Sequence, residues 1–313
     1  MSAQSASGCC GPTAAVGLHP SLDARRLGAP RQSGPIAQGD RFANMAAIPA
    51  GSFIMGSDAD EGEPGDGEAP ARRVHLPAFR IDRTAVSNRE FAAFVQATGY
   101  VSLAEEVGVS FVFAGLLPDD FPPTRGVVDA PWWREVEGAC WSHPEGPGSC
   151  VDQRADHPVV HVSWHDAVAY CHWAGKRLAT EAEWEYAARG GLAGKRYAWG
   201  DELTPDGVHR CNIWQGRFPM RNTQDDGFYG TAPVDAFEAN GFGLFNVCGN
   251  VWEWCVDPWP GGQRSLRGGS FLCHDSYCNR YRVAARTSNT PDTAASNIGF
   301  RVACDPPLNR SLA

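Results

Sequence analysis

The chain has 313 residues and a formal net charge of −9 at pH 7. This length can bury a sizeable core and allows one large domain or two. The acidic balance argues against a nucleic-acid-binding protein, which would carry a basic stripe, so we expect no nucleic-acid partner. No apolar run approaches the ~20 residues of a membrane helix, so we expect no membrane partner either.

The first residues carry no signal-peptide pattern. Residues 1–16 have neither a basic n-region nor an apolar h-region, which predicts a cytoplasmic protein. A reducing cytosol should keep most of the 11 cysteines as thiols. If they are oxidised, Cys140 could pair with Cys150, and Cys211 could pair with Cys255.

Composition divides the chain into three parts. Residues 1–44 are rich in Ala, Gly, Pro, Ser and Arg without periodicity, which predicts a disordered tail. Residues 45–307 contain no linker or internal repeat, so we expect one domain there. Residues 308–313 are expected to form a flexible C-terminus.

Capping boxes predict three helices within the domain. They are expected from Ser87 to Gly99, from Ser163 to Gly175 and from Thr180 to Gly190. The chain has 35 Gly and 23 Pro, so short strands and long loops should make up the rest. The predicted fold class is therefore α+β, loop-rich and low in secondary structure.

Two segments are rich in oxygen ligands of the kind that Ca²⁺ prefers, from both side chains and backbone carbonyls. The first contains Asn212, Ile213, Asp226 and Phe228, and the second contains Asn246, Gly249, Val251 and Glu253. Neither matches an EF-hand loop, and the spacing alone favours ordinary solvated loops.

Cys273 and Cys278 lie five residues apart in a segment with Ser270 and Tyr277 close by. This spacing places the two sulfurs about 140° apart on a helix and on opposite faces of a strand. They can converge only where the backbone bends, which the preceding Gly268–Gly269 pair would ease. Converging thiolates would suit Cu(I), whereas the bland alternative is a disulfide or two unrelated thiols.

Several motifs between residues 47 and 305 together resemble the formylglycine-generating enzymes, the sulfatase-modifying factors. The motifs shared with the wider superfamily include Gly-Glu-Ala-Pro-Ala-Arg-Arg-Val (67–74), His-Pro-Val-Val-His-Val-Ser-Trp (157–164), Thr-Glu-Ala-Glu-Trp-Glu-Tyr-Ala-Ala-Arg-Gly-Gly (180–191) and Gly-Asn-Val-Trp-Glu-Trp (249–254). The motifs specific to the enzymes are the cysteine pair followed by Asn-Arg-Tyr-Arg (279–282) and Asn-Thr-Pro-Asp (289–292).

This resemblance implies a copper-dependent oxidase that uses O₂ to convert a client cysteine into formylglycine. The client would be an unfolded sulfatase with a Cys-x-Pro-x-Arg segment, and the enzyme would act as a monomer with a C-type-lectin-like fold. Cys273 and Cys278 would hold Cu(I), and the oxygen-rich segments would hold one or two structural Ca²⁺ ions. The remaining site residues implied are Ser270 and Tyr277 at the oxygen and thiol site, Trp252 as a wall of the pocket, and Arg286 nearby.

Other functions remain open at this point. A non-catalytic C-type-lectin-like module would explain the shared motifs, but not two thiols placed beside Ser270 and Tyr277. An iron-dependent sulfoxide synthase would need an extra helical domain, and a disulfide-using oxidoreductase would be expected to carry Cys-x-x-Cys. In the tail, Cys10-Gly11-Pro12 resembles the client motif, but Ala14 stands where the arginine would be, which favours an incidental match.

Overall fold

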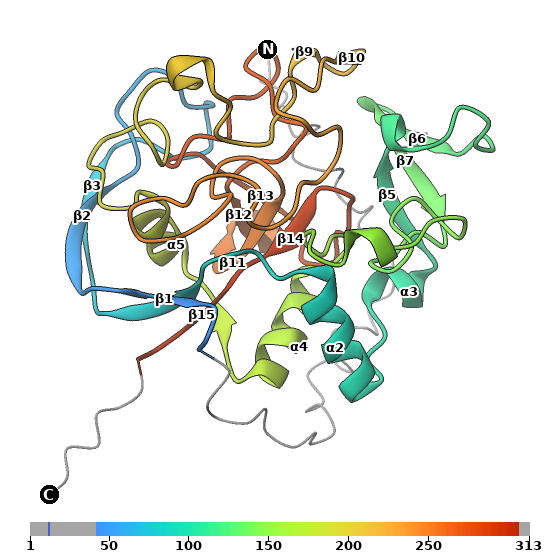
Figure 1. Ribbon diagram of the computed structural model, residues 1–313, viewed down its shortest axis with the longest axis horizontal. Helices are drawn as coiled ribbons and strands as arrows, with labels where there is room; N and C mark the ends of the chain where they lie inside the picture. Colours follow the sequence, from blue (N-terminus) through green and yellow to red (C-terminus); the bar gives the residue numbers. More distant parts are fainter. Residues whose placement is uncertain (1–11, 13–41, 307–313) are drawn as a thin grey trace, which may run out of the picture.

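The structure is a computed structural model that describes residue 12 and residues 42–306. Most of the predicted tail and the C-terminal residues 308–313 lie outside the described part. Figure 1 shows few regular elements joined by long loops, with helices α2 and α4 side by side below the strands. The prediction of a loop-rich α+β fold is confirmed.

The three predicted helices are present, and each begins at a complete capping box. The cap residues are Ser87, Ser163 and Thr180, and each accepts a hydrogen bond from the backbone of the third helical residue. A fourth helix begins at a box that our sequence analysis missed, between Ser102 and Glu105. The α-helices are α2 (Asn88–Thr98), α3 (Leu103–Val107), α4 (Trp164–Ala174) and α5 (Glu181–Ala188). The 3-10 helices are η1 (Ala114–Leu116), η2 (Asp152–Arg154), η3 (Pro205–Gly207) and η4 (Pro260–Gly262).

A mixed four-stranded sheet lies at the centre of the molecule (Figure 1). Its order is β13 (Arg286–Asn289), β12 (Gln263–Arg267), β11 (Trp252–Trp259) and β14 (Ile298–Phe300). Strand β14 pairs with β11 in parallel, with Trp252 opposite Ile298. The segment between β12 and β13, which carries both candidate cysteines, therefore starts and ends in this sheet.

The other strands form smaller sheets around this centre. An antiparallel sheet contains β1 (Met45–Ile48), β4 (Phe79–Asp82), β15 (Val302–Cys304) and β8 (Arg177–Leu178). A second contains β5 (Val109–Phe113), β7 (Ala130–Glu137) and β6 (Arg125–Val127), and lies at the right of Figure 1. Two hairpin sheets pair β2 (Gly51–Met55) with β3 (Arg72–Leu76), and β9 (Gly216–Arg217) with β10 (Arg221–Asn222).

Buried aromatic side chains dominate the core. Trp184, Trp252 and Trp254 are at most 1% exposed, and Phe91 and Phe300 are fully buried. Buried indole nitrogens need partners, and two find them at a distance in the sequence. Trp184 Nε1 donates to Glu253 Oε2 at 2.7 Å, and Trp254 Nε1 donates to the carbonyl of Val162 at 3.1 Å. These bonds tie α5 and the start of α4 to the central sheet.

No disulfide joins the cysteines of residues 42–306. The pairs Cys140–Cys150 and Cys211–Cys255, which we considered for an oxidised protein, are thiols here. Burial raises the pKa of the Cys248 thiol to about 12 and the pKa of the Cys171 thiol still further. These two thiols therefore stay protonated at neutral pH and behave as small apolar side chains.

Candidate active site

The two candidate cysteines converge. Two tight turns shape their loop: the Cys273 amide donates to the Ser270 carbonyl at 2.9 Å, and the Cys278 amide donates to the His274 carbonyl at 2.7 Å. The Sγ atoms lie 3.2 Å apart, well beyond the ~2.05 Å of a disulfide bond. Both residues are at most 1% exposed. The bend that this approach requires lies within the loop as well as at Gly268–Gly269, both of which have positive φ.

Ser270 connects the cysteine pair to the central sheet. Its backbone N–H donates to Cys273 Sγ at 3.4 Å, which helps to fix the position of that sulfur. Its hydroxyl accepts a hydrogen bond from Asn297 Nδ2 at 3.1 Å. The carbonyl of Asn297 in turn accepts from the backbone N–H of Trp252 at 2.9 Å. Three of the predicted site residues are therefore linked through Asn297, which our sequence analysis did not identify.

Trp252 is a buried component of this region. It is fully buried on β11 and belongs to the same core cluster as Cys273 and Cys278. Its Nε1 atom has no partner among the described residues. A buried indole N–H without a partner is uncommon, and such groups often mark functional regions.

Tyr277 lies in an aromatic group at the edge of the cysteine loop. Its half-buried ring stacks on Phe218, with centroids 5.0 Å apart, and meets Trp132 edge to face at 5.2 Å. Phe218 and Trp132 come from segments far from Tyr277 in the sequence, so sequence patterns could not identify them as neighbours. The aromatic walls fix the tyrosine ring while it remains partly open to solvent.

Arg286 is the first residue of β13, directly after the cysteine loop. Its guanidinium forms a two-pronged ion pair with Glu181, with an Nε–Oε1 distance of 2.8 Å. It also stacks over Trp259, 4.2 Å from the ring centroid. Its contacts thus join β13 to the start of α5 and to the end of β11. They indicate a structural contribution beside the cysteine loop.

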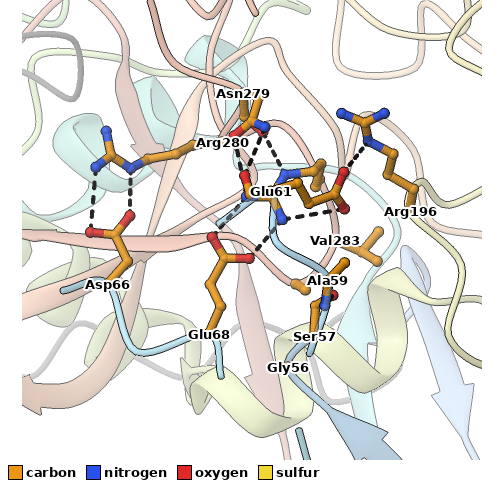
Figure 2. A network of polar contacts seen from close by, with 12 residues as sticks. Gly56, Ser57, Ala59, Glu61, Asp66, Glu68, Arg196, Asn279, Arg280 and Val283 are labelled. Atoms are coloured by element: carbon orange, nitrogen blue, oxygen red, sulfur yellow. Dashed lines mark hydrogen bonds and ion pairs between the residues drawn. The ribbon is translucent and has the colours of Figure 1, made fainter. Parts of the chain in front are cut away.

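A buried ion-pair network supports the segment that follows Cys278. Arg282 contacts Glu68 through two nitrogens, at 2.6 and 2.8 Å, and Arg280 Nε contacts Asp66 at 2.6 Å. Figure 2 shows Asp66 and Glu68 reaching across from the β2–β3 loop. Burial raises the pKa of Asp66, and Arg280 partly offsets that rise. Our sequence analysis missed both acids, since each is 214 residues from its arginine.

The donors at the cysteine pair fit a two-coordinate soft metal. The described part of the chain contains no group of three or more His, Cys, Asp or Glu side chains arranged to hold a metal ion. The described residues therefore do not provide the three or four protein ligands that zinc needs. Two buried sulfurs beside a backbone N–H match the preference of Cu(I) for thiolates.

The first oxygen-rich segment is assembled in space. Asp226 accepts hydrogen bonds from the amides of Phe228, at 2.9 Å, and Ile213, at 3.1 Å. Gln215 Nε2 donates both to the carbonyl of Ile213 and to Asp226 Oδ2. An amide nitrogen therefore sits between two oxygens that a cation would use. Burial raises the pKa of Asp226, and the hydrogen bonds from Phe228, Gln215 and Ile213 partly offset that rise.

The second oxygen-rich segment is less clearly assembled. The Glu253 carboxylate is already paired with Arg301, at 2.9 Å through two oxygens, and accepts from Trp184. Asn246 donates through Nδ2 to the Pro233 carbonyl, while its buried Oδ1 has no partner in the described structure. A cation here would use Asn246 Oδ1 and backbone carbonyls rather than the Glu253 side chain.

A cavity of about 170 Å³ adjoins the cysteine loop. His274, Asp275 and Tyr281 from that loop line one side of it, and Trp214 and Gln215 line the other. A larger cavity of about 240 Å³ lies elsewhere, beside Asn240 and Asn246. The smaller cavity lies between the cysteine loop and the first oxygen-rich segment, since Ile213 also lines it.

Comparison with known proteins gives the family. A model of the sulfatase-modifying factor enzyme 1-like domain matches residues 32–306. The chain belongs to this family of formylglycine-generating enzymes. It is 59% identical over 283 residues to the formylglycine-generating enzyme of Thermomonospora curvata, covering 84% of this chain and 93% of that one. The enzyme of Streptomyces coelicolor is 55% identical over 300 residues, covering 90% and 96%.

A solved structure supports the family fold. PvdO from Pseudomonas aeruginosa aligns with a TM-score of 0.61 at 26% identity, covering 84% of this chain and 94% of that chain. This member of the formylglycine-generating enzyme family therefore shares its overall fold with a solved structure. No helix in the described residues is long and apolar enough to cross a bilayer.

Proposed function

We propose that this protein oxidises the cysteine of a Cys-x-Pro-x-Arg segment in unfolded sulfatases to formylglycine, using O₂ and Cu(I). The observation that carries the proposal is the 3.2 Å approach of Cys273 and Cys278 Sγ in a buried loop. The 59% identity to a formylglycine-generating enzyme supports the same reaction class.

The overall reaction sets what the site must provide. Cysteine and water give formylglycine and hydrogen sulfide with the loss of two electrons and two protons. Reduction of O₂ to two waters takes four electrons, so a thiol reductant must supply the other two. Cys273 and Cys278 would hold the metal, which supplies the redox chemistry with O₂ when bound. The Ser270 N–H would help to hold Cys273 Sγ in place for that ion.

The surrounding residues would position the client. Tyr277, with its half-buried ring stacked on Phe218, offers a hydroxyl at the edge of the loop. A cysteine buried in a folded sulfatase could not enter a site whose own sulfurs are at most 1% exposed. An extended peptide could, and its proline and arginine would hold the reacting carbon near attack distance.

Calcium would have a structural function in this account. The oxygens of Ile213 and Asp226 converge on one amide nitrogen, which marks a position suitable for a cation. We propose a first Ca²⁺ there and a second near Asn246 Oδ1. We further propose a cytoplasmic location, because the cysteines of residues 42–306 are thiols, as a reducing compartment would keep them. The monomeric state is proposed from the family resemblance alone.

Mass spectrometry of a Cys-x-Pro-x-Arg peptide tests the proposal directly. The peptide is incubated with the protein, a thiol reductant and O₂, with and without added copper. We expect the mass change of cysteine-to-formylglycine conversion, and only when copper and O₂ are both present. Binding of the peptide without conversion under any condition would favour the non-catalytic lectin-like module.

A further inference from the structure

Pro12 is buried against the folded domain. Of residues 1–41 the structure describes this residue alone. Its carbonyl oxygen accepts a hydrogen bond from Asn289 Nδ2 at 3.4 Å, across 277 residues of sequence. Pro12 is buried and Asn289 is only 2% exposed, so the contact lies inside the molecule rather than on its surface.

Asn289 is held in an orientation that presents its donor to Pro12. Its Oδ1 atom accepts from the Thr290 amide at 2.8 Å and from the Thr293 hydroxyl at 3.0 Å. The oxygen of the amide group is thereby engaged, and Nδ2 is the donor directed at the Pro12 carbonyl. This arrangement suits the backbone of an extended peptide, whose carbonyls point outward at intervals.

The same loop connects Asn289 to the candidate active site. The loop between β13 and β14 begins after Asn289, and its last residue, Asn297, donates to Ser270 Oγ beside Cys273. Pro12 therefore rests on a segment whose other end helps to fix the cysteine loop. The Asn-Thr-Pro-Asp run that begins at Asn289 is also among the motifs specific to the enzymes.

We infer that the N-terminal segment around Pro12 binds in the client groove as an intramolecular competitor of the client. The inference rests on the proposed function, because that function makes the groove a receptor for Cys-x-Pro. Cys10 stands two residues before Pro12, which is the spacing of the client motif.

The tail lacks the arginine of the client, since Ala14 stands at that position. Its intrinsic affinity should therefore be lower than that of a true client. Covalent attachment offsets this weakness, because a tethered segment has an effective concentration that can reach the millimolar range. The result is a reversible block that a client with its arginine can displace.

Alkylation of Cys10 in the full-length protein tests this inference. The rate of reaction with N-ethylmaleimide is measured by mass spectrometry for the wild type, Pro12→Ala and Pro20→Ala. Pro20 is the matched control, because it lies in the same tail outside the Cys-x-Pro spacing. If the segment is bound nine-tenths of the time, Cys10 should react about tenfold faster in Pro12→Ala than in the wild type. Pro20→Ala should match the wild type, and Ala14→Arg should slow the reaction further.

A Ser-x-Pro-x-Arg peptide, which cannot consume the reagent, shows whether the segment occupies the client groove. Excess peptide should raise the wild-type rate to that of Pro12→Ala and leave the variant unchanged. Equal Cys10 rates in the wild type and Pro12→Ala would overturn the inference, and protection that the peptide cannot relieve would overturn the assignment to the groove. Protection that the peptide relieves, in a protein that converts no client, would uphold the inference while the proposed chemistry failed.

Discussion

Arg282 and Glu68 form a two-pronged ion pair in which the side chains are only 1% and 4% exposed. The pair fastens the β2–β3 loop to the segment directly after Cys278. Breaking a buried pair from one side leaves an uncompensated charge, which typically costs about 3–5 kcal/mol. We expect Glu68→Ala to lower the free energy of unfolding by an amount in that range, as measured by urea denaturation.

Two controls separate the buried charge from a general loss of packing. Arg125→Ala breaks an ion pair with Glu135 in which Arg125 is 78% exposed, and should cost about 0–1 kcal/mol. The double variant Glu68→Leu/Arg282→Met removes both charges and should recover part of the loss. A Glu68→Ala effect no larger than that of Arg125→Ala would contradict the buried-charge explanation.

Calcium should act on stability rather than on chemistry. Asp226 is the only carboxylate that we assign to the first site, so its removal should weaken Ca²⁺ binding most. A ligand that binds only the native state stabilises it by about 2.7 kcal/mol at a hundredfold excess over Kd. We expect EDTA to lower the melting temperature of the wild type and to leave Asp226→Asn unchanged. If EDTA left the melting temperature of the wild type unchanged, the first Ca²⁺ site would be ruled out.

His161 should make the protein less stable in acid. The ring is fully buried with Nδ1 2.7 Å from Ser110 Oγ, and burial lowers its pKa to about 3 from the usual 6.5. Below pH 6.5 the His161 imidazole therefore binds a proton in the unfolded chain, whereas it stays neutral in the folded state until the pH approaches 3. Stability from this group is complete above pH 6.5 and falls towards pH 3, by about 1.4 kcal/mol per pH unit.

The His161→Asn variant isolates this effect, because asparagine tolerates the positive φ of 58° at this position. Between pH 6.5 and 4 the wild type should lose up to roughly 3 kcal/mol relative to the variant. Asp82 works in the opposite direction, since burial raises its pKa to about 6 despite Lys176. It is common to both proteins, so the difference between their pH profiles reports His161. Parallel profiles would refute the assignment.

Client recognition should depend on an extended peptide. Replacing the client's arginine with alanine should mainly raise KM, since that residue acts through remote binding rather than on the reacting carbon. The same cysteine in a prefolded sulfatase should be inert. Peptide kinetics and a folded client measured in parallel provide the test, and equal conversion of the two clients would favour docking on a surface instead.

Local signals predicted the helices well because a capping box involves residues only three positions apart. Ser87, Ser163 and Thr180 each begin a helix as expected, whereas the box at Ser102 begins a helix of only five residues and has little periodic pattern. The parallel pairing of Trp252 with Ile298 joins strands that are distant in the chain, so no local pattern indicates it. Local signals predicted only the loop-rich α+β class, and the family resemblance was needed to specify which fold of that class the chain adopts.

The candidate metal ligands could be predicted from the sequence, but the residues that hold them in position could not. The spacing of Cys273 and Cys278 showed only that a bend was needed, and the turns at Ser270 and His274 now show how it is made. Asn297 links Ser270 to Trp252, and this contact could be recognised only after β14 had been placed beside β11. Arg286 was assigned by resemblance, and its contacts with Glu181 and Trp259 could not be read from the sequence.

The paired thiols are the centre of this account, and single substitutions test them most directly. Copper content and peptide conversion are measured together for the wild type, Cys273→Ser, Cys278→Ser and the exposed control Cys150→Ser. We expect one copper per protein in the wild type and in Cys150→Ser. Each active-site variant should lose the copper and keep its fold, as measured by circular dichroism. Its turnover should fall by more than about 100-fold, which exceeds the loss typical for residues that only hydrogen-bond to a metal ligand. Wild-type turnover and copper content in either Cys273→Ser or Cys278→Ser would contradict the account.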